Sequence, residues 1–382
     1  MNVRRLRSRL RASSYRSSRI ASSAPRLRRR QRGAAIISAL LVVALSAILV
    51  SGMLWRQQVQ LRRIENQRLL AQAQWISRGA LDWTRLVLRS EADTSAGVTY
   101  LGGAWGMPVA KTRLSDFLGQ IGDVRAEQGQ DTWVSGSIED AQARFNLRNL
   151  VSTPAPGALQ LNLTQIQVFA RLLQLLGIDG QLAKNAAVFL RSGLNYSVTR
   201  FQTGSTPGST TSSTQQVGGG SGGTNFSSNP GLSDSDGNSG SAPILMTSVD
   251  ALQDVPGFTP DIVARLRPFV TILPTTTPVN MNTAPAEVVA ATVQGMSLSS
   301  AQAFVARRQT VFFRNLSDVQ LALEGSGVPQ TGIDTSLCDV NSSYFLIHGR
   351  VQHERAVVDR TTLVWRDTLT HTTRIVRVRD EP

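Results

Sequence analysis

A long apolar run follows a basic leader near the start of the chain. From Ala34 to Trp55 there are 22 residues, most of them apolar and none charged, with Arg32 before the run and Arg56 after it. At about 1.5 Å of rise per helical residue, the run is roughly 33 Å long, which is enough to cross a hydrocarbon core of about 30 Å. The pattern therefore predicts one membrane-spanning helix.

The leader sets the expected orientation of this helix. Residues 1–33 hold 12 arginines and no acidic side chain, whereas the residues after Trp55 are mixed in sign. Because positive flanks stay in the cytoplasm, we expect a cytoplasmic N-terminus and a remainder across the membrane, in the periplasm of a bacterium. The run is longer than the apolar region of about 7 to 15 residues in a cleavable signal peptide. A plain uncleaved anchor and a mitochondrial presequence remain as alternatives.

The helical pattern continues beyond the membrane segment. Apolar side chains recur at spacings of three and four residues, while charged side chains fill the other faces. The apolar positions are Leu61, Ile64, Leu69, Ala73, Ile76, Ala80, Trp83 and Val87. No proline lies between Pro25 and Pro108. The pattern predicts a single helix of about 55 residues, half of it in lipid and half covering a soluble domain.

A short strand segment and a helical block come next. Residues 131–150 alternate and predict two short strands joined by a turn. The apolar face of a helix over residues 163–176 ends at Gly177, and a second helix over residues 182–190 is expected to stop at Ser192 and Gly193. The block is then interrupted by a low-complexity stretch.

That stretch, residues 203–243, contains 10 Gly, 11 Ser and 6 Thr among 41 residues, and is too poor in apolar surface to order itself. Within it Asp234, Asp236 and Asn238 have the D-x-D-x-N spacing that can begin a calcium loop. Position 12 from Asp234 is Leu245 rather than Glu, so the segment is not an EF-hand. These three side chains are the candidate calcium ligands.

Helices return after the stretch, and strands close the chain. Ser248 is a predicted helix start, Pro256 and Gly257 a turn, and Thr259 with Pro260 the N-cap and first residue of the next helix. From Tyr344 onward, three segments rich in Val, Ile and Thr alternate and predict three antiparallel strands.

Composition excludes several chemistries. The formal net charge of +14 belongs mostly to the leader, because the other 349 residues carry 28 basic and 26 acidic groups. Neither Lys111 nor Lys184 follows a glycine, so a phosphate-binding G-x-x-x-x-G-K-[ST] loop is excluded. Cys338 is the only cysteine, which excludes an internal disulfide and a cysteine-based zinc cluster.

No catalytic residues can be assigned from spacing. The three histidines all lie in the last 35 residues, where we expect them on strand faces, and no nucleophile can be paired with a base. They are His348, His353 and His371. We therefore expect no enzyme, and a membrane-anchored hydrolase is only a minor alternative.

A basic leader ending in Gly33, an apolar helix starting at Ala34 and a long amphipathic continuation resemble a type IV prepilin or pseudopilin. The resemblance implies that a prepilin peptidase in the membrane cuts between Gly33 and Ala34 and methylates the new N-terminus at Ala34. Two positions depart from the family pattern. The first mature residue is Ala rather than Phe or Met, and the fifth, usually Glu, is Ser38.

The missing glutamate points to one branch of the pseudopilins. The K-type minor pseudopilin of the type II secretion system (general secretion pathway protein K) lacks this Glu, because a subunit at the tip has no earlier subunit above it to pair with. Residues 65–91 and 131–150 resemble the corresponding segments of that family, and the strongest signature is N-x-N-T-A-P at residues 280–285. The calcium site common in the family after W-x-D-x-D finds no acid in residues 186–195, so it is lost or relocated here.

The resemblance implies an α+β fold: a pilin-like long N-terminal helix packed on a small antiparallel β-sheet, with a large inserted α-helical domain of helix-hairpin-helix or SAM-like type. The expected parts are a leader over 1–33, the N-terminal helix over 34–90, the first part of the pilin-like domain over 91–147, the inserted domain over 148–325 with its loop 203–243, and C-terminal strands over 326–382. Implied partners are the I- and J-type minor pseudopilins, the major pseudopilin, the prepilin peptidase and the inner membrane.

Two other functions remain as alternatives. A type IV pilus minor pilin has the same leader and helix. The VPGF turn, residues 255–258, also resembles a helix-hairpin-helix unit whose turn amides grip phosphate, as in a membrane-anchored DNA-uptake protein. Arginines that could contact phosphate are Arg265, Arg267, Arg307 and Arg308. Because the mature chain is nearly neutral and has no basic stripe, we expect no nucleic-acid partner.

Overall fold

The computed structural model describes residues 32–121, 131–155, 158–203, 244–326, 334 and 336–381. The chain divides into two units, Met1–Glu65 and Asn66–Pro382. The predicted continuous helix is confirmed: α1 extends over Arg32–Thr94, 63 residues without a break. Its bounds therefore include residues of both units.

In the first unit, the apolar run of α1 is uncovered. Side chains from Ile36 to Trp55 are more than half exposed, Trp55 by 72%. Among the described residues, one helix is long and apolar enough to cross a membrane, with a mean hydropathy of 2.5 over its apolar window. Such a surface is stable only where hydrocarbon or other apolar helices cover it.

The second unit contains a five-stranded antiparallel sheet in the order β1-β2-β9-β10-β11. The three predicted C-terminal strands are confirmed as β9, β10 and β11, and β9 is the central strand. The alternation of the sequence did not predict β1. The strands are β1 (Val109–Arg113), β2 (Thr132–Asp140), β9 (Tyr344–His353), β10 (Ala356–Arg366) and β11 (Thr373–Glu381).

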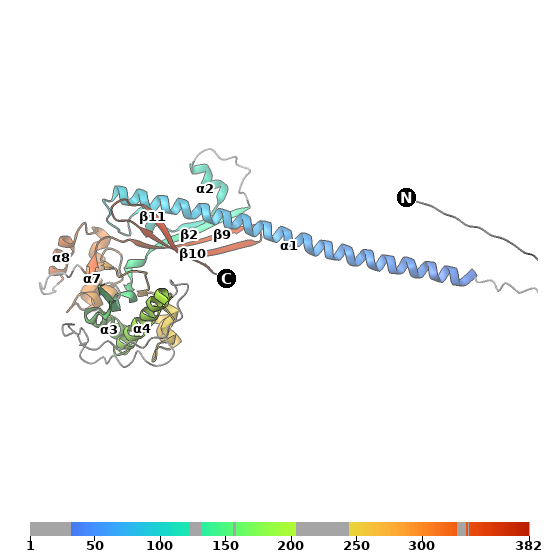
Figure 1. The fold of residues 1–382 in the computed structure, drawn as a ribbon. Coiled ribbons are helices and arrows are strands. Elements are labelled where there is room, and N and C mark those ends of the chain that lie inside the picture. Colours follow the sequence, from blue (N-terminus) through green and yellow to red (C-terminus); the bar gives the residue numbers. More distant parts are fainter. Residues whose placement is uncertain are drawn as a thin grey trace, which may run out of the picture. The chain divides into compact units, whose positions relative to one another are not determined.

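Residues 66–94 of α1 cover one face of this sheet (Figure 1). Leu81 and Leu88 pack against Phe345 and Ile347 of β9, and the Trp105 ring meets Phe345 edge-on with 5.7 Å between centroids. Burying a side chain of this size stabilises the fold by about 1.5–3 kcal/mol. The predicted apolar stripe overlaps the packed face only in part: Ala73 is buried, but Leu61 and Ile64 are exposed, and Leu81 and Leu88 were not among the predicted positions.

The helical domain is inserted between two paired strands. β2 ends at Asp140 and β9 begins at Tyr344, yet the two strands pair over nine residues from Thr132↔His353 to Asp140↔Phe345. Residues 141–343 therefore leave and re-enter the sheet at one end. Figure 1 shows helices α3, α4, α7 and α8 gathered beside the sheet. This confirms the expected α+β fold with an inserted helical domain.

The inserted domain has its own large apolar core, in which Phe145 and Phe169 stack with their centroids 5.3 Å apart. Its α-helices are α3 (Leu163–Leu175), α4 (Leu182–Thr203), α5 (Pro260–Leu266), α6 (Ala286–Thr292), α7 (Leu298–Thr310) and α8 (Leu316–Glu324). Short strands are β3 (Phe145–Asn146), β4 (Val151–Ala155), β5 (Ala158–Leu161), β6 (Val270–Thr271), β7 (Val279–Asn280) and β8 (Cys338–Asp339). A further helix, α2 (Leu114–Ile121), precedes β2.

The predicted caps of the inserted domain are confirmed. Ser248 caps the 3-10 helix η5 (Val249–Asp254), and the Thr259 hydroxyl caps α5 with Pro260 at its first position. Gly177, with φ of +69°, ends α3 in a left-handed conformation that favours glycine. Each cap satisfies backbone groups that a helix end leaves unpaired.

Two local predictions were wrong. The two strands expected over residues 131–150 do not form a hairpin: β2 pairs with β1 and β9, and β3 pairs in parallel with β6. The helix expected to stop at Ser192 and Gly193 continues as α4 to Thr203. The Ser192 hydroxyl donates to the Val188 carbonyl one turn earlier at 3.0 Å, so this residue is satisfied within the helix.

Candidate functional site

The expected peptidase junction lies at the beginning of α1. Gly33 and Ala34 belong to the first turn of the helix, which begins at Arg32. Ser38, at the position where the family has Glu, donates its hydroxyl hydrogen to the Ala35 carbonyl at 3.0 Å. Ser38 therefore needs no polar partner from outside its own helix, whereas an unpaired carboxylate in hydrocarbon is costly. Cleavage and methylation at this junction stay predictions.

A cluster of buried polar side chains joins the sheet to the inserted domain. We call it the polar joint; its members are Thr99, Asp140, Asn280, Thr283, Ser342 and Arg366. Asp140 ends β2 and is 5% exposed. Its Oδ2 accepts hydrogen bonds from the Ser342 and Thr283 hydroxyls, both at 2.6 Å, and from Asn280 Nδ2 at 2.9 Å. Asn280 and Thr283 belong to the inserted domain, so these bonds connect it directly to β2.

Arg366, at the end of β10, completes the joint from the sheet. Its guanidinium donates to the Thr99 hydroxyl at 2.8 Å and to the backbone carbonyls of Leu88 and Ser342, both at 3.1 Å. It also lies over the Phe345 ring, 4.6 Å from the centroid. Burial lowers the pKa of Arg366 to about 10, so the group stays charged at neutral pH. Its charge interacts favourably with the buried Asp140 carboxyl.

Burial also acts on Asp140. It raises the pKa of this carboxyl above its ordinary value, and the hydrogen bonds from Ser342, Thr283, Asn280 and the Gln142 amide oppose that rise. A carboxyl buried without such donors would be much costlier. The hydrogen bonds from these four donors therefore offset part of the cost of burying the Asp140 carboxyl.

The N-x-N-T-A-P signature lies at this joint. Asn280 donates to Asp140, and its Oδ1 accepts from the Asn282 amide at 2.9 Å. Asn282 forms two hydrogen bonds with the Phe313 backbone, at 2.8 and 2.9 Å. The signature thus fixes the segment before α6 both to β2 and to the loop after α7.

Cys338 lies beside the joint, in β8, which pairs with β7 through Val279. Burial, together with the nearby Asp334 and Asp339 carboxylates, raises the pKa of the thiol to about 12. Because the thiolate is the reactive form, we expect iodoacetamide at neutral pH to label the chain only after it unfolds. As Cys338 is the only cysteine, the mass of the intact protein reports the result. Rapid labelling of the folded protein would show that the β7–β8 pairing opens readily.

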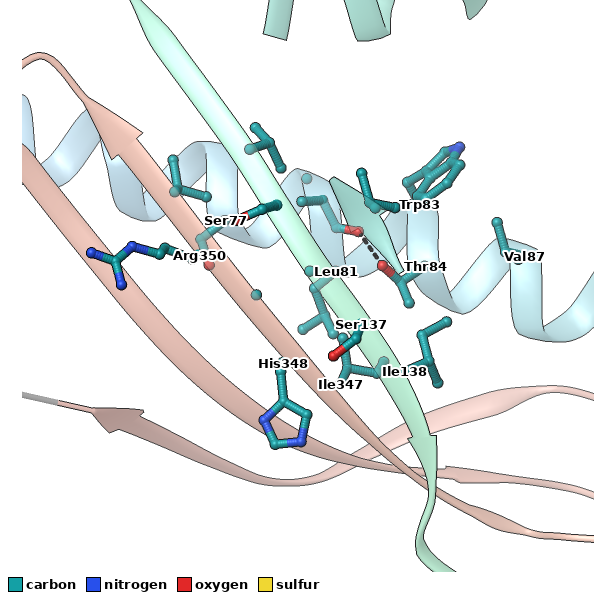
Figure 2. Close-up of a pocket in the computed structure, with 18 of the residues that line it drawn as sticks. Ser77, Leu81, Trp83, Thr84, Val87, Ser137, Ile138, Ile347, His348 and Arg350 are labelled. Carbon is teal, nitrogen blue, oxygen red and sulfur yellow. Dashed lines mark hydrogen bonds between the residues drawn. The ribbon is translucent and has the colours of Figure 1, made fainter. Parts of the chain in front are cut away.

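An apolar pocket of about 340 Å³ lies between α1, α2 and the sheet. Gly136 of β2 and Gly349 of β9 are paired directly opposite each other in its floor. Because neither residue has a side chain, this part of the sheet leaves space for the pocket. Leu81 of α1, Ile138 of β2 and Ile347 of β9 line one part of it, as Figure 2 shows. The Thr84 hydroxyl on its wall is already bonded to the Ala80 carbonyl at 2.7 Å.

The two glycines of the floor predict opposite effects of the same substitution. A Cβ at Gly349 would meet nothing within 4 Å, whereas a Cβ at Gly136 would lie 2.6 Å from the His348 carbonyl oxygen. We expect Gly349→Ala to raise the free energy of unfolding by about 0.5–1 kcal/mol, because it restricts the unfolded chain without strain. Gly136→Ala should lower it. Urea unfolding of both variants tests this, and equal effects would contradict the geometry.

The turn that resembles a DNA-binding hairpin packs inside the domain. Gly257 has a φ of +95°, and a Cβ there would lie 2.5 Å from the Leu182 side chain of α4. Three of the four arginines named as phosphate ligands are engaged internally. Arg265 donates to the Leu176 carbonyl, Arg267 pairs with Asp250 at 2.5 Å, and Arg308 donates to the Met281 carbonyl at 2.7 Å. Arg307 is exposed.

The three histidines form separate contacts. His348 and His353 lie on β9 as expected, whereas the expectation was wrong for His371, which lies in the turn between β10 and β11 with a φ of +54°. His353 meets the Thr132 hydroxyl at 2.7 Å, and His371 meets the Asp93 carboxylate at 2.7 Å. His348 lies 3.0 Å from the Thr361 hydroxyl, but that hydroxyl donates to Glu381 at 2.7 Å. Thr361 is therefore not arranged as a nucleophile with His348 as its base.

The candidate calcium ligands Asp234, Asp236 and Asn238 lie outside the described residues. Within the described part of the chain, no group of three or more His, Cys, Asp or Glu side chains could hold a metal ion. Calcium binding by these three residues stays a prediction.

Sequence reasoning missed the polar joint. Its members are single polar residues scattered over more than two thirds of the chain, and the N-x-N-T-A-P signature contains only two of them, Asn280 and Thr283. A signal was present in Asp140, which is an acid at the end of an alternating strand. Its burial depends on partners that only the fold brings together.

Two family models match the chain, over residues 143–275 and 279–341, and both describe protein K of the type II secretion system. Together they cover just over half of the chain. The matched residues include β6 and, in the polar joint, Asn280 and Thr283. Three residues, 276–278, lie between the two models and are not matched.

Curated relatives and a solved structure agree with these models. Protein K of the type II secretion system of Pseudomonas aeruginosa is 31% identical over 163 residues, and that of Pectobacterium carotovorum is 27% identical over 179. These matches cover 41% and 44% of this chain, and 43% and 47% of the relatives, so the chain aligns with less than half the length of each.

The crystal structure of the GspK–GspI–GspJ complex of the enterotoxigenic Escherichia coli type 2 secretion system contains a chain of the same fold. It has a TM-score of 0.54 and 15% identity, and the match covers 84% of this chain and 99% of that one. The chain thus belongs to the protein K family of the type II secretion system.

Proposed function

We propose that this protein is the minor pseudopilin at the tip of the type II secretion pseudopilus, where it is needed to export folded proteins across the outer membrane. The observation that carries the proposal is α1, which begins as an uncovered apolar helix and ends packed on a sheet, in a chain of the protein K family. A helix of this kind can join a helical fibre while its folded part stays outside the membrane.

The proposed assembly begins in the inner membrane. The basic leader keeps the N-terminus in the cytoplasm, and the folded remainder lies in the periplasm. Prepilin peptidase cuts between Gly33 and Ala34 and methylates Ala34. The apolar half of α1 then packs against the corresponding helices of the I- and J-type minor pseudopilins, and the major pseudopilin adds below them. The E. coli neighbour, solved as a GspK–GspI–GspJ complex, supports this choice of partners.

Two features favour the tip position. Ser38 satisfies its hydroxyl within α1, so the subunit needs no amine partner in the membrane above it. The inserted domain, residues 141–343 between β2 and β9, adds bulk at one end of the sheet. Bulk there would block the addition of a further subunit on that side.

A structural role accounts for the described side chains better than a catalytic one. Cys338 is buried with a raised pKa, and the hydroxyl beside His348 donates elsewhere. The most elaborate polar cluster, the polar joint, is buried and holds two parts of the fold together. We therefore infer that the protein acts by binding its partners and not by catalysis.

Deleting the gene tests the function. We expect folded exoproteins to accumulate in the periplasm and export to return when the intact chain is supplied. Antibody labelling of the chain on isolated fibres should mark one end only. Unchanged export together with lost surface pili would favour a type IV pilus minor pilin, and labelling along the fibre would contradict the tip position.

A further inference from the structure

A second pocket, of about 490 Å³, lies in the inserted domain and is lined by polar groups. It is bounded by the 3-10 helix η3 (Leu147–Leu150), the start of β4, the N-terminus of α3 and the loop before β7. Hydroxyl and amide side chains dominate its wall, and none of its described lining residues is acidic. They are Arg148, Asn149, Ser152, Thr153, Asn162, Gln165, Pro274, Thr275, Thr276, Thr277, Pro278 and Ser336.

Arg148 is the only charged side chain in this lining. Its guanidinium donates to the Val151 carbonyl and, at 3.2 Å, to the Thr153 hydroxyl, which uses two of its five N–H groups. No carboxylate pairs with it within the described chain, and burial lowers its pKa. Because a partly buried cation without a counter-charge is costly, the remaining N–H groups favour a negatively charged ligand.

The N-terminus of α3 adds a second source of positive potential. Asn162 caps this 13-residue helix by accepting from the Gln165 amide at 3.2 Å. The first backbone N–H groups of a helix have no partners within it, and its dipole favours an anion there. Both Asn162 and Gln165 line the pocket.

Gln165 is the most informative residue of the wall. It is 6% exposed, and its side-chain amide makes no hydrogen bond to any residue that the structure describes. In a capping box, a Gln at this position bonds back to the N–H of the cap residue. Here the Asn162 N–H is already donated to the Leu150 carbonyl at 2.9 Å, so that arrangement is blocked. A buried amide left without a partner in a pocket wall is suited to a ligand.

We propose that this pocket, formed by Arg148, Gln165 and the N-terminus of α3, binds an oxyanion, either a carboxylate or a phosphate group. The guanidinium supplies charge-assisted hydrogen bonds, the Gln165 amide supplies an unpaired N–H donor, and the dipole of α3 favours a negative charge at this end of the helix. The hydroxyls of Thr153 and Thr276 in the lining can bond to further polar atoms of the ligand. This site is independent of the polar joint and of α1.

The test is ligand-dependent stabilisation of the full-length chain in detergent. Inorganic phosphate and acetate are added up to roughly 50 mM, with sodium chloride at matched ionic strength as the reference, and the unfolding midpoint is measured. We expect a rise in midpoint with at least one of the two oxyanions, and which of them acts distinguishes phosphate from carboxylate. No rise with either would overturn the proposal.

Three variants locate the effect. Arg148→Gln should weaken binding at least about tenfold, because it removes a charge-assisted interaction. Gln165→Leu should also weaken binding while leaving the ligand-free midpoint unchanged or higher, since it removes a buried polar group that lacks a partner. It keeps the test decisive even if Arg148→Gln fails to fold. Arg307→Gln, at an exposed arginine outside the pocket, should bind as before; an equal loss in this control would mean non-specific attraction and would sink the proposal.

Discussion

Replacing Gly33 with alanine is expected to leave the chain uncut, so that the protein extracted from membranes keeps residues 1–33. The peptidase has to reach the backbone between Gly33 and Ala34, which lies in the first turn of α1. Glycine allows close approach and weakens a helix by up to about 1 kcal/mol relative to alanine, so the first turn opens easily at this residue. Alanine both adds a Cβ and strengthens the turn. Intact-mass measurement and N-terminal sequencing read out the result.

Gly52 provides a matched control. It lies in the same apolar part of α1, and a Cβ there would meet nothing within 4 Å. Gly52→Ala should be cut as the unmodified chain is, with a new N-terminus at Ala34. If the Gly33 variant were also processed normally, the pseudopilin assignment of the leader would fail, and α1 would be an ordinary anchor.

Replacing Asp140 with alanine is expected to lower the free energy of unfolding by about 3–5 kcal/mol, because several buried donors would lose their acceptor at once. The Ser342, Thr283 and Asn280 donors would lose their shared acceptor in a buried site, and Arg366 would lose the favourable charge of Asp140. Leaving buried donors unpaired costs more than the hydrogen bonds themselves contribute. Urea unfolding in detergent, followed by tryptophan fluorescence, measures the loss.

Asp82 is the control for this experiment. This aspartate is paired with Arg85 at 2.8 Å, and its side chain is 68% exposed. Asp82→Ala should cost no more than about 0.5 kcal/mol, because exposed ion pairs contribute little. A loss at Asp140 no larger than that at Asp82 would mean that the polar joint does not hold the inserted domain to the sheet.

The parts of the fold that depend on local pattern could be predicted from sequence. The spacing of Leu69, Ala73, Ile76 and Ala80 predicted α1, and these residues extend along the half of the helix that packs on the sheet. Ser248 and Thr259 predicted helix starts, since a cap acts within three residues. Alternation after Tyr344 predicted three strands because one face of each is buried.

The parts that depend on distant partners could not be predicted in this way. Residues 131–150 alternate as a hairpin does, but alternation does not identify the neighbouring strand, and the ladder partner of β2 is β9. β1 was missed because it is a short strand at the edge of the sheet and most of its residues are exposed. Ser192 and Gly193 are typical helix-stopping residues, yet packing of α4 in the inserted domain overrides that preference.

The candidate sites show the same limit. The proposed peptidase junction depends only on adjacent residues, so it could be predicted from the sequence. The polar joint and the Arg148 pocket could not be, since Asp140 meets Asn280, and Arg148 shares a wall with Gln165 and Thr276, only after the chain has folded. In each case the residue types are ordinary and only their burial makes them informative.

The position of β9 in the middle of the sheet has a consequence for how the protein is made. Ribosomes synthesise β1 and β2 early, whereas β9 follows the whole inserted domain. In the sheet β9 pairs with the early strand β2 on one side and with the next strand, β10, on the other. The inserted domain has its own apolar core, but α1 has no complete sheet to cover until translation is nearly finished. Slow, late closure of this kind is typical of topologies with distant strand partners. During that interval the apolar stripe of α1 is exposed to solvent. We therefore expect the nascent chain to bind chaperones at the membrane surface.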